Sequence, residues 1–304
     1  MWAVIDIGSN TIRLVIYTLE NGRPHSMLNK KYPAGLAGYI DQANRITPEG
    51  IQVLLDVLTD IQSILQYIRP QSIFPFGTAS LRNSANGAEI VALIRDRCGL
   101  DVRILTGEEE AIFDYYGALE NNIGDSGLLM DVGGGSTELT FFQNKQIVSA
   151  TSIPLGSLNL YKKWVDGLLP TSKEAHRIKQ EVRGYLHQLP LPTEDLNAQP
   201  VYSVGGTARA ALKLMRAKYD LGEKEEYTLM QLKWFLLDIK DNPRRLLHDI
   251  LRAAPDRVHT MIPGLLVFHA VAKYFHSVSF VTSSYGVREG YLMHQLAGRG
   301  EVRV

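Results

Sequence analysis

Residues 128–142 read LLMDVGGGSTELTFF, with an acidic residue and three consecutive glycines between two apolar runs. Apolar runs on either side of a glycine-rich break predict the two strands of a hairpin. We expect Gly133, Gly134 and Gly135 to adopt positive φ angles in the turn, because glycine does so without steric penalty. Such a turn leaves several backbone N–H groups pointing at one place, which is typical of an anion site.

The residues beside the glycines extend this predicted anion site. Ser136 and Thr137 follow the turn and carry hydroxyl groups suited to phosphate oxygens. Asp131 precedes it, and a carboxylate repels a bound phosphate unless a divalent cation lies between them. The pattern therefore predicts a phosphate site that uses Mg²⁺. The alternative interpretation is an ordinary glycine-rich hairpin that binds nothing.

A second copy of the pattern lies 125 positions earlier in the chain. The segment IDIGSNTIRL that begins at Ile5 aligns without a gap with MDVGGGSTEL, which begins at Met130. Asp6 then corresponds to Asp131, and the turn at Gly8–Asn10 corresponds to the glycine turn. This repetition predicts an internal duplication, with two similar domains whose turns face a phosphorylated ligand across a cleft.

Four further motifs stand along the chain: TASLR from Thr78, GEEEA from Gly107, SVGGT from Ser203 and YGVREG from Tyr285. With the two turns, and in this order, they resemble the exopolyphosphatase/guanosine pentaphosphate phosphatase family of the sugar kinase, heat-shock-protein and actin superfamily. The resemblance covers nearly the whole chain. It implies an α/β fold of two similar actin-like ATPase (ribonuclease H-like) domains, each a mixed sheet flanked by helices, with the active site in the cleft between them.

The resemblance also implies roles for individual residues. Glu110, immediately before Ala111, aligns with the family's catalytic glutamate, which orients and deprotonates the attacking water. Arg82 is suited to clamp a phosphate, and a strand followed by two glycines and a helix predicts an anion site at Gly205. The predicted phosphate ligands are Gly8, Ser9, Asn10, Arg82, Gly133, Gly134, Gly135, Ser136, Thr137, Gly205, Gly206 and Thr207, and the predicted magnesium ligands are Asp6, Asp131 and Glu138.

One stretch departs from the family pattern. The family carries an arginine and a Gly-Glu-Gly loop over its substrate, and this chain has glycine at both places, Gly35 and Gly38. The resemblance implies metal-dependent release of the terminal phosphate from inorganic polyphosphate. One alternative is removal of a phosphate from guanosine pentaphosphate at the same site. The other is a phosphate or nucleotide sensor without turnover, which the two glycines favour and the intact Glu110, Asp131 and Glu138 oppose.

Composition agrees with a two-domain enzyme. A chain of 304 residues exceeds one ordinary core, so we expect domains at 1–124 and 125–304, the first completed by a helix within 287–304. The 32 basic and 32 acidic residues give no global attraction to nucleic acid or membranes. A single cysteine, Cys98, excludes an internal disulfide and fits a reducing cytoplasm, and no signal peptide or membrane span is recognised.

Local signals predict individual elements. Thr47 followed by a proline predicts the start of a helix that Pro70 ends, and Asn21-Gly22 predicts a hairpin turn. Residues 73–76 predict a short strand, against which Pro75 counts because proline cannot donate to a ladder. The apolar stripe at 232–236 predicts either core or a homodimer surface.

Overall fold

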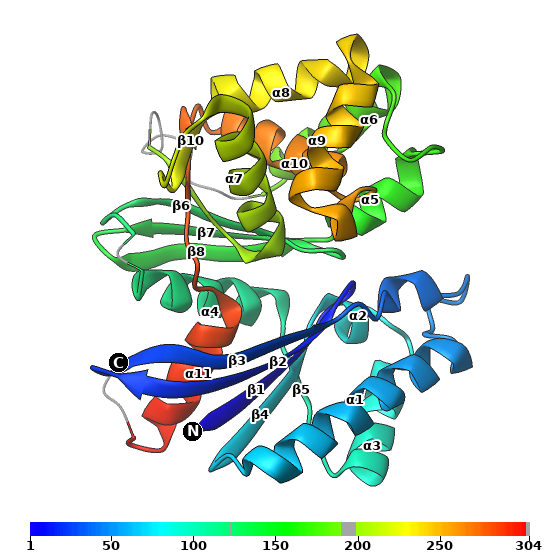
Figure 1. The fold of residues 1–304 in the computed structure, drawn as a ribbon, viewed down its shortest axis with the longest axis vertical. Helices are drawn as coiled ribbons and strands as arrows, with labels where there is room; N and C mark the ends of the chain where they lie inside the picture. Colours follow the sequence, from blue (N-terminus) through cyan, green and yellow to red (C-terminus); the bar gives the residue numbers. More distant parts are fainter. Residues whose placement is uncertain (122, 190–198, 302–304) are drawn as a thin grey trace. The chain divides into compact units, whose positions relative to one another are not determined.

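The structure is a computed structural model that describes residues 1–121, 123–189 and 199–301 (Figure 1). Its chain forms two compact units. The first contains residues 1–113 and the segment from Arg288 onward, and the second contains residues 114–287.

The chain passes between these units inside helices. One division falls within α4 (Gly107–Leu119), and the other follows the first residue of α11 (Val287–Gly298). The division predicted after residue 124 lies beyond the end of α4, and that domain assignment stays a prediction.

The first unit is a five-stranded mixed sheet in the order β3-β2-β1-β4-β5. The strands β1, β2 and β3 are antiparallel neighbours, whereas β4 and β5 run parallel to β1. The predicted turn at Asn21-Gly22 joins β2 to β3. Besides α4 and α11, the elements are β1 (Trp2–Ile7), β2 (Ile12–Glu20), β3 (Arg23–Tyr32), the short 3-10 helix η1 (Leu36–Tyr39), α1 (Pro48–Ile68), β4 (Ser72–Gly77), α2 (Ala79–Arg82), α3 (Gly87–Cys98) and β5 (Arg103–Ile104).

Helices cover both faces of this sheet. Strand residues such as Ile5 and Leu14 form one buried cluster with the apolar stripe of α1 and with α3. On the other face, the ring of Tyr291 from α11 packs edge-on against Phe76 and Phe113. The central strands β1 and β4 therefore bury most of their side chains against helices, whereas the edge strand β3 is largely exposed.

The second unit is a six-stranded mixed sheet in the order β10-β11-β9-β6-β7-β8. Its elements are β6 (Gly127–Val132), β7 (Thr137–Gln143), β8 (Gln146–Ile153), α5 (Ser157–Trp164), α6 (Ser172–Leu186), β9 (Val201–Val204), α7 (Gly205–Tyr219), β10 (Glu226–Thr228), α8 (Leu229–Asp241), α9 (Pro243–Ala253), the 3-10 helix η2 (Pro255–Arg257), α10 (Met261–Tyr274) and β11 (Ser279–Thr282). The main core lies between one face of this sheet and the helices α5 to α10, which Figure 1 shows gathered on that face.

The two sheets repeat one plan, which confirms the predicted duplication of the fold. In each, an antiparallel triplet of consecutive strands is extended by parallel strands beside its first member, so that β6-β7-β8 corresponds to β1-β2-β3 and β9 to β4. Even the register irregularity recurs, between Ile16 and Tyr17 in β2 and between Phe141 and Phe142 in β7. The predicted α/β class of two similar mixed sheets flanked by helices is confirmed.

No helix in the described part of the chain is both long and apolar enough to cross a membrane.

A buried histidine in α10 makes a prediction about acid stability. Burial, with nearby Lys179, Lys273 and Lys233 also contributing, lowers the pKa of His269 to about 4. Its Nδ1 atom is buried and has no hydrogen-bond partner among the described residues. Below the usual histidine pKa of about 6.5, His269 is protonated in the unfolded chain but stays neutral in the folded chain. The free energy of unfolding therefore falls as the pH drops from about 6.5 to about 4.

Urea unfolding across this pH range measures the effect. The His269→Leu variant, which cannot titrate, is expected to lose less stability between the two pH values than the wild type does. His25→Leu, at an exposed position, serves as the control and should retain the wild-type slope. Equal slopes in wild type and His269→Leu would contradict the assignment.

Candidate active site

Two turns occupy equivalent places in the two sheets, each between the first two strands. In the first unit the amide of Gly8 donates to the Thr11 carbonyl at 3.1 Å, and in the second the amide of Gly133 donates to the Ser136 carbonyl at 3.0 Å. Asp6 and Asp131 each precede the turn by two residues at the end of their strands. The predicted pairing of the two motifs thus extends to their hydrogen bonds.

The reason for glycine in these turns differs from the expected one. Gly8, Gly133, Gly134 and Gly135 do not adopt positive φ, so the prediction of a left-handed turn was wrong. At Gly8 and Gly133 a side chain would instead be crowded by a nearby backbone carbonyl. An added Cβ would lie 3.0 Å from the Thr11 carbonyl oxygen at Gly8, and 3.3 Å from that of Ser136 at Gly133.

The start of α5 is hydrogen-bonded to the backbone of the second turn. The carbonyls of Gly133, Gly134 and Gly135 accept hydrogen bonds at 2.9, 3.0 and 2.9 Å from the Ser157 amide, the Leu158 amide and the Asn159 side chain. In the part of the chain that the structure describes, the amides of Gly134 and Gly135 have no acceptor. Gly134 is partly exposed and Gly135 is buried, and the role of these two N–H groups in an anion site stays a prediction.

The first turn is held in a similar way by the stretch that departs from the family pattern. The carbonyls of Ser9 and Asn10 accept hydrogen bonds at 2.9 Å from the amides of Ala37 and Gly35. Residues 35–37 thus support the turn through their backbone in this chain, whereas the family's Arg and Glu side chains are missing.

The second turn adjoins the start of α7. The Thr207 hydroxyl donates to the Val132 carbonyl at 2.7 Å, which ties the end of β6 to α7. Gly205 has a φ of 81°, and an added Cβ there would lie 2.0 Å from Oδ1 of Asp131. The Asp131 carboxylate therefore occupies the space that a side chain at Gly205 would need.

A residue that sequence reasoning missed lies over the same loop. A Cβ added at Gly206 would lie 2.1 Å from Nη2 of Arg257, and Nη1 of this arginine donates to the Thr207 hydroxyl at 3.4 Å. Burial lowers the pKa of Arg257, while the carboxylates of Asp256 and Asp131 oppose that shift. The second unit thus places a partly desolvated guanidinium beside the predicted anion loop and Asp131.

Two predicted ligands are fully enclosed. The Thr137 hydroxyl is buried and donates to the Leu155 carbonyl at 2.6 Å, so that hydroxyl serves the fold. Glu138 is the cross-strand partner of Asp131, is only 1% exposed, and accepts a hydrogen bond from the Ser152 hydroxyl at 2.7 Å.

In the first unit, Arg82 and Glu110 form an ion pair. Nη1 of Arg82 lies 2.7 Å from Oε2 of Glu110 and also donates to the Leu105 carbonyl at 3.1 Å. Their side chains are 17% and 12% exposed. The fold therefore brings the predicted base and a predicted phosphate ligand into direct contact, because α2 and the first turn of α4 both follow strands of the parallel part of the sheet.

The neighbouring acid Glu109 has a structural role at the start of α4. Glu109 accepts from the Thr106 amide at 2.9 Å while the Thr106 hydroxyl accepts from the Glu109 amide at 3.1 Å, which is a capping box at the helix start. Glu108 is exposed.

Asp6 is paired within its own unit. Its Oδ2 lies 3.2 Å from Nη1 of Arg288, a residue of α11. Burial raises the pKa of Asp6, and the charges of Arg288 and Arg13 oppose that shift. The adjacent Glu289 is buried and accepts a hydrogen bond from the Tyr17 hydroxyl, which fixes α11 against β2. Arg288 thus supplies the counter-charge for this carboxylate within the described fold.

The fit of a cation differs between the two turns. Among the described residues, no three His, Cys, Asp or Glu side chains gather into a metal-binding group. Asp131 and Glu138 are cross-strand neighbours, and their carboxylate oxygens are the donors that Mg²⁺ prefers. Asp6 already has Arg288 as its cation. The second turn thus offers two neighbouring carboxylates for a magnesium ion, with the charge of Arg257 acting on one of them, Asp131.

Comparison with known proteins identifies the family of this chain. The model of the Ppx/GppA phosphatase family matches residues 15–298, so the chain belongs to that family. It is 26% identical to guanosine-5′-triphosphate,3′-diphosphate pyrophosphatase of Aliivibrio fischeri over 95% of this chain and 58% of the relative, and spans little more than half of such relatives. It is 23% identical to exopolyphosphatase 1 of Mycobacterium bovis over 96% of this chain and 87% of the relative.

Solved structures agree on the fold. The crystal structure of an exopolyphosphatase from Cytophaga hutchinsonii superposes with a TM-score of 0.85 at 22% identity, covering 99% of this chain and 98% of that one. The similarity extends over both units and confirms the predicted fold class, and the match of the family model confirms the predicted family.

Proposed function

We propose that this chain hydrolyses a phosphoanhydride and releases the terminal phosphate of inorganic polyphosphate. The observation that carries the proposal is the turn after Asp131. Its glycine carbonyls are all bonded to α5, and the amides of Gly134 and Gly135 remain as donors. Preorganised amides of this kind stabilise the negative charge that develops on a transferring phosphoryl group.

Each half of the chain contributes different groups to this reaction. In the first unit, Glu110 accepts the proton of the attacking water, and Arg82 orients Glu110 and binds a phosphate oxygen. In the second unit, the amides after Asp131, the loop at Gly205 and the guanidinium of Arg257 bind further phosphate oxygens. Arg257 adds a cation that the sequence did not reveal.

Asp131 and Glu138 are the residues that would hold magnesium. When bound, the ion supplies neutralisation of phosphate charge. The free thiol of Cys98 fits a reducing compartment, and we place the reaction in the cytoplasm.

Guanosine pentaphosphate is the second candidate substrate. The relatives named guanosine-5′-triphosphate,3′-diphosphate pyrophosphatase support it, and the residues that bind phosphate would be the same. A phosphate sensor without turnover is the third candidate, because the family's arginine and glutamate are replaced by glycine at Gly35 and Gly38. A sensor would bind polyphosphate and release no phosphate.

Metal dependence tests the proposal. Phosphate release from polyphosphate is expected to stop in excess chelator and to return with Mg²⁺, because the ion held by Asp131 supplies the neutralisation of phosphate charge that the reaction needs. In the Asp131→Asn variant Mg²⁺ should not restore phosphate release. In Asp125→Asn, which changes an exposed carboxylate, Mg²⁺ should restore it as in the wild type. Release that persists undiminished in chelator rules out the metal role, and no release in either condition rules out hydrolysis.

A further inference from the structure

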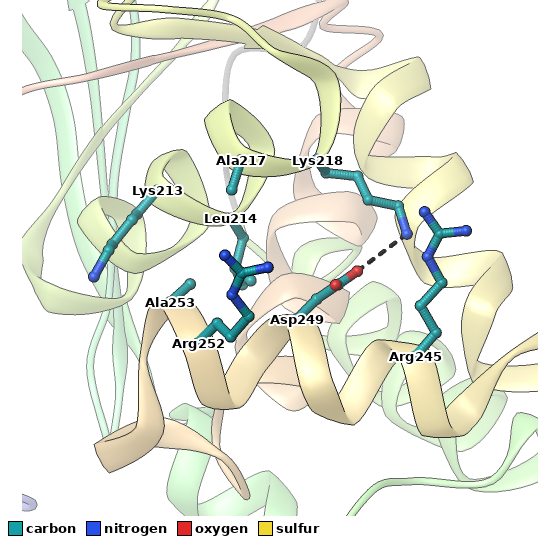
Figure 2. A pocket seen from close by; sticks show the side chains of 8 residues that line it. All are labelled: Lys213, Leu214, Ala217, Lys218, Arg245, Asp249, Arg252 and Ala253. Carbon is teal, nitrogen blue, oxygen red and sulfur yellow. Dashed lines mark hydrogen bonds and ion pairs between the residues drawn. The ribbon is translucent and has the colours of Figure 1, made fainter.

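A cavity of about 440 Å³ lies in the second unit between α7 and α9. Figure 2 shows Arg245, Asp249 and Arg252 rising from α9 toward α7, which contributes Lys213 and Lys218. Charged groups thus line two opposing walls of the cavity. None of these residues takes part in the candidate active site.

Positive charge predominates in this cavity. Lys218 lies 2.9 Å from Asp238 and 3.1 Å from Asp249, so one cation faces two carboxylates. Burial acts to raise the pKa of Asp238, but contacts with cations lower it overall, and the hydrogen bond from Lys218 is the largest of them. The charge of Arg245 contributes to the same lowering. In the described part of the chain, Lys213 and Arg252 form no ion pair with an acid. The lining therefore keeps unbalanced positive charge at Lys213 and Arg252.

The spacing of the cations sets the size of the ligand. Arg245 and Arg252 are seven residues apart on α9, which places them on one face and about 10 Å apart along the helix axis. An extended anion follows such a row of cations along a helix better than a single orthophosphate does. A chain of several phosphates has the length and the repeated charge to do so, and guanidinium groups bind phosphate oxygens with two parallel hydrogen bonds.

We propose that the cavity between α7 and α9 binds an oligophosphate chain, either free or carried by a nucleotide. It is a second anion site in the same unit as the glycine turn. Lys213 lies eight residues after Gly205 on α7, about 12 Å along the helix, and Arg257 follows α9 by a few residues. A ligand here therefore contacts the two elements that carry the Gly205 loop and Arg257.

Amine labelling read out by mass spectrometry tests the site without relying on hydrolysis. Lys213 is exposed in the cavity and should react with an amine-reactive ester; tripolyphosphate in chelator should protect it saturably. Lys240, exposed on α8, reports general screening and should stay reactive. Orthophosphate should protect Lys213 at least about tenfold more weakly, because it is shorter and carries fewer negative charges.

Variants of α9 provide matched controls. Replacing both Arg245 and Arg252 by Gln should raise the tripolyphosphate concentration for half protection by about tenfold or more, since charge-assisted hydrogen bonds are lost. Arg244→Gln removes the same charge at an exposed position outside the cavity and should leave protection unchanged.

Repeating the labelling with a nucleoside triphosphate shows whether the bound phosphate chain is free or part of a nucleotide. Protection by tripolyphosphate alone identifies a free chain, and equal or better protection by the nucleotide identifies a carried one. Absence of protection by both, equal protection of Lys240, or an equal effect of Arg244→Gln would overturn the proposal.

Discussion

Replacing Glu110 by glutamine is expected to lower the rate of phosphate release by about 10²–10⁴-fold, the usual cost of losing a general base. Glutamine keeps the size of the side chain and can still bond to Arg82, which lies 2.7 Å from Oε2. It cannot accept the proton that water loses on attack. Affinity for polyphosphate should change little, because the proposed phosphate ligands are amides and cations elsewhere in the site.

Single-turnover phosphate release and equilibrium binding together separate these effects. Glu108→Gln is the control, since Glu108 is an exposed acid in the same first turn of α4. It should release phosphate at nearly the wild-type rate. A Glu110→Gln protein that releases phosphate at that rate too would show that another group is the base.

The second large effect is expected for Gly205→Ala. The residue has a φ of 81°, a region that costs L-residues about 1–2 kcal/mol, and its new Cβ would lie 2.0 Å from Oδ1 of Asp131. Overpacking of this kind costs about 1–3 kcal/mol more. The Asp131 carboxylate must move to make room. Because a displacement of about 1 Å can cost 10²-fold in rate, phosphate release should fall by at least about that factor.

Gly222→Ala separates the clash from the backbone strain. Gly222 has a φ of 59°, but no atom lies within 4 Å of an added Cβ. This variant should lose only about 1–2 kcal/mol of stability in urea unfolding and keep its activity. If both variants lose equal stability and both stay active, Asp131 is not held against Gly205 as the structure indicates.

The parts of the fold that the sequence predicted are those encoded locally. Thr47 caps α1 by accepting from the Gly50 amide, and Arg69 ends the helix just before Pro70, as predicted. The doubt about Pro75 proved unnecessary. Pro75 has a strand partner on one side only, because β4 pairs with β1 at this position whereas β5 pairs with β4 only at Phe76 and Gly77. A proline, which has no N–H, is tolerated at such an edge position.

The glycine turn shows where local reasoning fails. Three glycines suggested positive φ, yet the turn closes through a bond from the Gly133 amide to Ser136 and needs none. Its shape depends on α5, since the Gly134 carbonyl accepts from the amides of Leu158 and Asn159. Likewise, the Thr137 hydroxyl bonds to Leu155. A motif read alone gives the donors present in a turn but not which of them the fold uses.

The remaining charged groups lie far away in the sequence. Arg257 contacts Thr207 across 50 residues, and Arg288 contacts Asp6 across 282. Neither arginine stands in a pattern whose spacing indicates its partner, so only the folded chain reveals them. The roles of the predicted site residues stay predictions until the variants are measured.

Phosphate release from long polyphosphate, tripolyphosphate and guanosine pentaphosphate, measured side by side with Mg²⁺ on one preparation, tests the central claim most directly. Release from long polyphosphate at the highest rate, lost in Glu110→Gln, is the predicted result. Release from guanosine pentaphosphate alone, or tight polyphosphate binding with no release from any of the three, would contradict it.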